Sequence, residues 1–198
     1  MFTHPWLRKA DLAAADNEWF EAFIYLWVVF NAWSSHVVAD REQSENDTYL
    51  WQAACLDSEL ASRFEKLLRD GGSFRNCAES FWAIWPVFKV RTLVDHGIGP
   101  WDWEDSRRDY RATCFQKKLS IGDFGPQCYL DHQLQDAHTN GGDPLRVPLD
   151  WRHSLAAIYK VRCNLFHGGK SFLNSGDIRF CEFAYRILDS VWRPETGA

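Results

Sequence analysis

The chain has 198 residues, of which 46% are apolar and 25% are charged, and its formal net charge at pH 7 is -5. This length predicts a single domain over residues 1–198, large enough to bury a core without disulfide or metal staples. No stretch is long and apolar enough to cross a membrane, and the chain starts without an export signal, so we expect a soluble cytoplasmic protein that binds no membrane.

The six cysteines show no metal-binding pattern, because none forms a Cys-x-x-Cys pair and none has a histidine at zinc-finger spacing. We therefore expect reduced thiols, no metal site and no cofactor. The acidic balance excludes a generally basic nucleic-acid-binding protein, although it leaves room for a local basic site.

The hydrophobic pattern is helical along nearly the whole chain and predicts an all-α bundle of about five to seven helices. The first predicted helix covers residues 18–38, with Asp16 as its N-cap. Nearly every face of it is apolar, as in the central helix of a bundle. Asn31 lies among its aromatic residues, and we expect its amide to be buried and hydrogen-bonded to another helix. A role for Asn31 in a functional site is the alternative.

Three further helical stretches are expected before residue 119, at residues 48–69, 73–94 and 101–118. The first of them contains a second N-cap candidate, Ser58, and Pro86 kinks or divides the next. Residues 119–148 are rich in glycine, proline and polar side chains and predict a long loop. Two more helices are expected near the end, at about residues 150–166 and 175–192.

The helix expected at 150–166 carries the most informative pattern. Arg162 falls within its apolar stripe, where a guanidinium is costly unless a carboxylate, a partner subunit or a phosphate pairs with it. His167 follows in the last turn, and histidine titrates near neutrality, as acid–base chemistry requires. The segment from residue 146 to 186 contains seven basic and three acidic residues, which gives it a local net charge of +4. This excess favours an anionic partner, with a solvated helix face as the alternative.

The segment Arg162-Cys-Asn-Leu-Phe-His167, followed by Gly-Gly-Lys, resembles the Arg-x-x-x-x-His signature of the HEPN (higher eukaryotes and prokaryotes nucleotide-binding) superfamily. The aromatic helix around residues 23–33 also resembles the opening helix of bacterial members. The resemblance implies a helical bundle that forms a homodimer through the motif-bearing helix. Catalytic members are metal-independent endoribonucleases that act as toxins or antiviral-defence effectors, so RNA is the implied substrate and an antitoxin or regulatory protein a possible partner.

By this resemblance, His167 is the general acid–base group and Arg162 holds the scissile phosphate and stabilises the transition state. Family members often have Asn, Asp or His directly after the arginine, whereas this chain has Cys163. Three further residues are candidates for supporting roles: Asn164, Asn31 and Lys170.

Alternatives to the endoribonuclease remain. A non-catalytic HEPN module that dimerises and binds a nucleotide or a partner protein is favoured by Cys163. An all-α structural or interaction protein, with Arg162 in a core salt bridge, is a third hypothesis. A second Arg-x-x-x-x-His, from Arg91 to His96, is interpreted as coincidence. The Gly-Gly-Lys-Ser tail of the motif is not a P-loop, because Asn164 stands where a glycine is required and the segment closes a helix.

Overall fold

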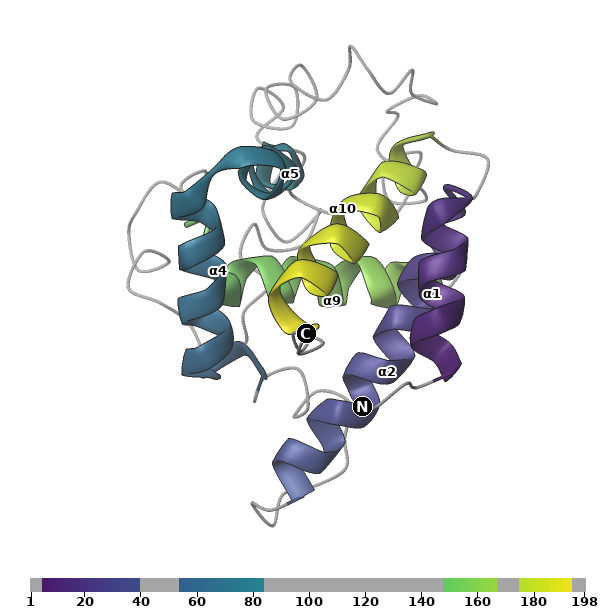
Figure 1. Cartoon of the computed structure of the whole chain (residues 1–198), viewed down its shortest axis with the longest axis horizontal. Helices are drawn as coiled ribbons and strands as arrows, with labels where there is room; N and C mark the ends of the chain where they lie inside the picture. The colour runs from purple at the N-terminus through teal and green to yellow at the C-terminus, as the bar shows by residue number, and fades with distance from the viewer. Residues whose placement is uncertain (1–4, 40–53, 84–147, 167–174, 194–198) are drawn as a thin grey trace, which may run out of the picture.

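The computed structural model describes residues 5–39, 54–83, 148–166 and 175–193. Within these ranges the chain is all-α, which confirms the predicted fold class (Figure 1). The described helices are α1 (Pro5–Ala15), α2 (Trp19–Ala39), α4 (Ser58–Asp70), α5 (Gly72–Ala83), α9 (Trp151–Phe166) and α10 (Ser175–Trp192). In this part of the chain, no helix combines the length and the apolar character that a membrane span requires.

Several sequence predictions lie outside the described residues. They are residues 48–53 of the helix at 48–69, the second half of the helix at 73–94 with its kink at Pro86, the helix at 101–118, and the loop at 119–148 up to residue 147.

Helix α1 was not predicted from the sequence, and its end corrects the N-cap expected for α2. The amide of Glu18 donates to the carbonyl of Ala13 at 2.8 Å, and the amide of Asn17 donates to Ala14 at 3.2 Å. Asn17 has a φ of 61°, so this pair of bonds is the Schellman ending of a helix. Asp16 therefore belongs to the C-terminal end of α1, and the prediction that it caps α2 was wrong.

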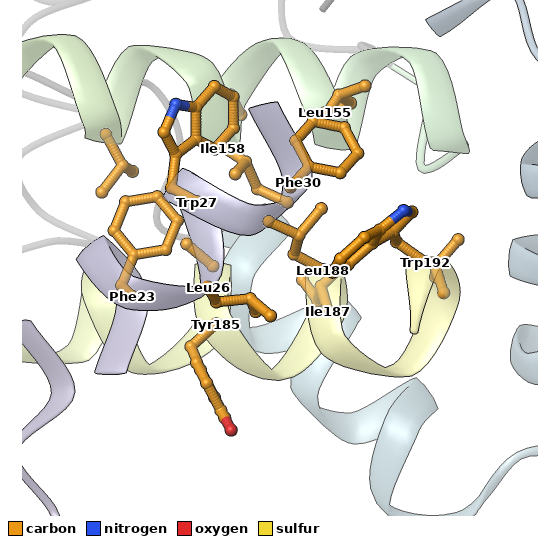
Figure 2. Packing of buried hydrophobic residues seen from close by; sticks show 14 of the residues in the cluster. Phe23, Leu26, Trp27, Phe30, Leu155, Ile158, Tyr185, Ile187, Leu188 and Trp192 are labelled. Atoms are coloured by element: carbon orange, nitrogen blue, oxygen red, sulfur yellow. The ribbon is translucent and has the colours of Figure 1, made fainter. Parts of the chain in front are cut away.

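Helix α2 runs through the centre of the core, as its apolar sequence predicted. Trp27 is 3% exposed, and its ring centroid lies 5.3 Å from that of Phe30. Phe30 meets Trp192 of α10 edge to face at 5.6 Å. Figure 2 shows these rings between α9 on one side and α10 on the other. Aromatic pairs of this kind contribute about 0.5–1.5 kcal/mol each beyond their buried area.

Helix α4 begins at Ser58, where the sequence indicated an interruption of the helix, but the prediction of Ser58 as N-cap was wrong. Asp57 is the N-cap, and its carboxylate accepts hydrogen bonds from the amides of Glu59 and Leu60. The helix ends at Gly71, which has a φ of 80°. A residue with a side chain adopts such a φ only with strain, so glycine suits this turn into α5.

Helix α9 spans the molecule behind α10, from α4 toward the pair formed by α1 and α2 (Figure 1). At its first residue, the indole N–H of Trp151 donates to the carbonyl of Ala54 at 2.8 Å. The same ring lies 6.2 Å from Phe64 of α4. Toward its other end, Tyr159 lies 6.0 Å from Trp27 of α2. The start of α9 is therefore anchored on one side of the core, and its C-terminal half lies near α2.

Candidate functional site

The candidate site lies on the C-terminal half of α9, where Arg162 occupies the edge of the buried face. Val161 and Ile158 are fully buried, whereas Arg162 is half-buried. The sequence placed Arg162 in the middle of the apolar stripe, and this placement was wrong. An α-helix turns about 100° per residue. The buried face therefore continues from Ile158 through Val161, and Arg162 projects beside this face, on the next row of side chains along the helix.

Two aromatic rings on that next row hold the side chain of Arg162. Its guanidinium carbon lies 4.9 Å from the ring centroid of Phe166 and 5.8 Å from that of Tyr159. Tyr159 comes three residues earlier and Phe166 four residues later, the spacing at which side chains on a helix are neighbours. The cation therefore stacks on aromatic surface, an arrangement that favours guanidinium over ammonium.

The two residues after the arginine differ in their surroundings. Cys163 is half-buried, and Nη1 of Arg162 donates to its Sγ at 4.0 Å. Asn164 is fully buried. Because two residues along a helix correspond to about 200° of rotation, Asn164 projects from nearly the opposite side to Arg162. The helix therefore separates these two sequence-predicted residues.

Asn31 lies on α2 and is half-buried, in contrast to the burial expected from its aromatic neighbours. Its backbone carbonyl accepts a hydrogen bond from the hydroxyl of Ser35 at 2.9 Å. The preceding residue, Phe30, points toward Leu155 in the first half of α9 (Figure 2).

Two of the predicted site residues, His167 and Lys170, lie outside the described residues, and so does the second Arg-x-x-x-x-His segment at 91–96. The roles of His167 and Lys170 stay predictions.

A polar pair at the start of α9 was not predicted from the sequence. The imidazole Nδ1 of His153 lies 2.7 Å from Oδ1 of Asp150, and the same oxygen accepts the backbone amide of His153 at 2.8 Å. His153 is 1% exposed, while the Asp150 side chain is 36% exposed. A histidine three residues after an acidic N-cap was the pattern that could have revealed it. Nine residues of helix, about 13 Å, separate His153 from Arg162, so the pair is distinct from the arginine site.

Among the described basic residues near the motif, Arg186 and Lys160 do not share the face of Arg162. Arg186 pairs with Glu182 at 2.9 Å and lies over the ring of Trp19 at 4.7 Å. Lys160 precedes Arg162 by two residues and therefore projects from nearly the opposite side of α9. The local net charge of +4 thus includes cations that make other contacts. This favours the alternative that these residues belong to solvated helix faces.

A separate ionic cluster ties α1 to the end of α10. Nη2 of Arg193 lies 2.6 Å from Oδ1 of Asp11 and 2.6 Å from Oδ1 of Asp189. Burial raises the pKa of Asp189, although the charge of Arg193 opposes this shift. Burial also raises the pKa of the neighbouring Tyr185 to about 12. These side chains are part of the scaffold and fix the position of α1 on the bundle.

Among the described residues, no group of three or more His, Cys, Asp or Glu side chains is arranged to hold a metal ion. Comparison of the chain with protein-family models, with curated proteins and with solved structures gave no match. The candidate site is therefore interpreted from its own residues and their chemistry.

Proposed function

We propose that this chain is a metal-independent endoribonuclease of the HEPN type. In this proposal Arg162 binds the scissile phosphate and His167 is the general acid–base group. The observation that carries the proposal is the setting of Arg162, a permanent cation held between two aromatic rings and followed five residues later by a histidine.

The stacking of Arg162 supports a role in phosphate binding. An aromatic contact uses the flat face of the guanidinium, whereas hydrogen bonds to a phosphate use its N–H edge, so the two interactions are compatible. Stacking also restricts the rotamers of a long side chain, which lowers the entropy cost of binding an anion. A cation preorganised in this way stabilises the charge that develops on the phosphate oxygens in the transition state.

The proposed reaction uses the 2′-hydroxyl of RNA as the nucleophile. The 2′-oxygen forms a bond to phosphorus while the bond from phosphorus to the 5′-oxygen breaks, which leaves a 2′,3′-cyclic phosphate and a 5′-hydroxyl end. A proton leaves the 2′-hydroxyl and a proton reaches the departing 5′-oxygen, and His167 acts at one of these two positions. In a homodimer that joins two copies of the motif, the partner's His167 serves the other position.

The direct test is incubation of a labelled, structured RNA with the protein in excess EDTA, alongside DNA of the same sequence and the His167→Ala variant. We expect the RNA to be cut to products with 2′,3′-cyclic phosphate ends. The DNA should stay intact because it lacks the 2′-hydroxyl. Cleavage that requires a divalent cation, or that His167→Ala leaves unchanged, would refute the proposal.

The burial of Asn164 favours a second candidate function. This residue was a candidate for a supporting role next to Arg162, yet it is fully buried on the other side of α9. A non-catalytic HEPN module that dimerises and binds a nucleotide or a partner protein needs no such group beside Arg162. Tight nucleotide binding by calorimetry, together with no RNA cleavage in the assay above, would favour this second function.

A further inference from the structure

Phe166 is an exposed aromatic residue in direct contact with the candidate arginine. Its side chain is 52% exposed, although it ends a helix whose other aromatic residues are buried or half-buried. The guanidinium of Arg162 lies over its ring. The ring therefore meets a cation on one side and leaves about half of its surface to solvent.

We propose that Phe166 stacks with a nucleobase next to the phosphate that Arg162 binds. This inference rests on the phosphate-binding part of the proposed function, but not on catalysis. A nucleotide carries its phosphate and its base on one sugar, so a guanidinium and an exposed aromatic ring in contact match both parts of it. Aromatic side chains and arginine planes are the groups on which proteins stack unpaired bases.

The packing around Arg162 explains why Phe166, and not Tyr159, takes this role. Tyr159 is half-buried and lies 6.0 Å from the ring of Trp27, which is itself 3% exposed. The Tyr159 side of the guanidinium is therefore backed by the core of the bundle. On its other side the guanidinium meets Phe166, which is 52% exposed and has no comparable backing from the described helices.

The test measures binding of two uncleavable oligonucleotides by fluorescence anisotropy. One is a 2′-O-methyl oligoadenylate, and the other is an abasic oligomer with the same number of phosphates. The proteins are the wild type, Phe166→Ala, Phe166→Tyr and a matched control, Leu56→Ala. Leu56 is also an exposed apolar residue, at 59% exposure, and it lies outside α9.

We expect Phe166→Ala to weaken binding of the oligoadenylate by about 5- to 150-fold, the range that loss of one stacked base produces. Binding of the abasic oligomer should not change. Phe166→Tyr and Leu56→Ala should bind as the wild type does. The dependence of affinity on salt concentration should also stay the same, because it reports phosphate contacts.

The proposal is overturned if Phe166→Ala binds both oligomers like the wild type, if it weakens both equally, or if the wild type binds neither. It is also overturned if the variant keeps the base preference and only converts a dimer into a monomer in sedimentation, since Phe166 would then serve self-association. Base-dependent binding through Phe166 in a protein that cuts no RNA would support this inference and refute the nuclease. RNA cleavage by the wild type, together with Phe166→Ala binding both oligomers as the wild type does, would support the nuclease and refute this inference.

Discussion

The guanidinium carbon of Arg162 lies 4.9 Å from the ring centroid of Phe166, one helical turn further along α9. Tyr159 lies on the other side of the guanidinium, and its own ring contacts Trp27 of α2. Arg162, at the edge of the core, thus contacts a series of aromatic rings that runs from the buried Trp27 through Tyr159 to the exposed Phe166. This row joins the fold to the proposed chemistry.

The shared carboxylate of Asp150 should stabilise the start of α9 through two bonds. Asp150→Ala removes the cap of the helix and the acceptor for the buried His153 imidazole, so we expect a loss of about 2–4 kcal/mol in the free energy of unfolding. Asp150→Asn retains an oxygen acceptor for both bonds, and its loss should be clearly smaller. Urea denaturation of both variants measures the difference. Equal losses would show that the carbonyl of asparagine cannot replace the carboxylate.

The left-handed backbone at Asn17 predicts a specific order of stabilities at the end of α1. Asn17→Ala should lower the free energy of unfolding by about 1 kcal/mol, because a side chain other than Asn or Asp is strained at this φ. Asn17→Gly should be as stable as the wild type or more stable. Asp16→Ala is the control and should change stability by less than about 0.5 kcal/mol. If Asp16 capped α2, its replacement would instead cost about 1 kcal/mol.

Stability should fall in alkaline solution because the half-buried thiol of Cys77 and the buried phenol of Tyr185 resist ionisation in the folded chain. Burial raises the pKa of Cys77 from 9.0 to about 12, and that of Tyr185 from 10.0 to about 12. Between pH 9 and pH 12 the unfolded chain releases protons that the native state retains, so the stabilisation is complete below pH 9 and is lost as the pH rises toward 12. Thermal unfolding at pH 8, 9.5 and 10.5 should show a smaller decline for Cys77→Ala than for the wild type. Parallel declines would contradict a raised pKa at Cys77.

Much of the fold could be predicted because α2, α9 and α10 carry strong local patterns. Their apolar periodicity sets their extent, and Asp150 marks the start of α9 directly. Helix α1 lacked such a pattern, since the residues it buries include the small side chains Ala10 and Ala13. It is also joined to the end of α10 by the pair between Asp11 and Arg193, which are 182 residues apart in the chain. Contacts of that separation leave no trace in local sequence.

The candidate site was predicted less completely than the fold. Arg162 was singled out as a cation on an apolar helix, and the structure adds the two rings that hold it. The burial of Asn164 could not be predicted, because a polar side chain gives no local indication of the face on which tertiary packing will place it. The spacing of Asp150 and His153 could have indicated their pairing, but it does not show that the histidine is buried.

The measurement that tests the account most directly is RNA cleavage by Arg162→Ala in EDTA, made together with its free energy of unfolding. A phosphate-binding arginine predicts that cleavage is lost while stability falls by about 1 kcal/mol, the value of its partly exposed aromatic contacts. If Arg162 is instead a structural residue with a buried partner charge, its truncation should lower the free energy of unfolding by about 3–5 kcal/mol. Unchanged cleavage by a strongly destabilised variant would contradict the central claim.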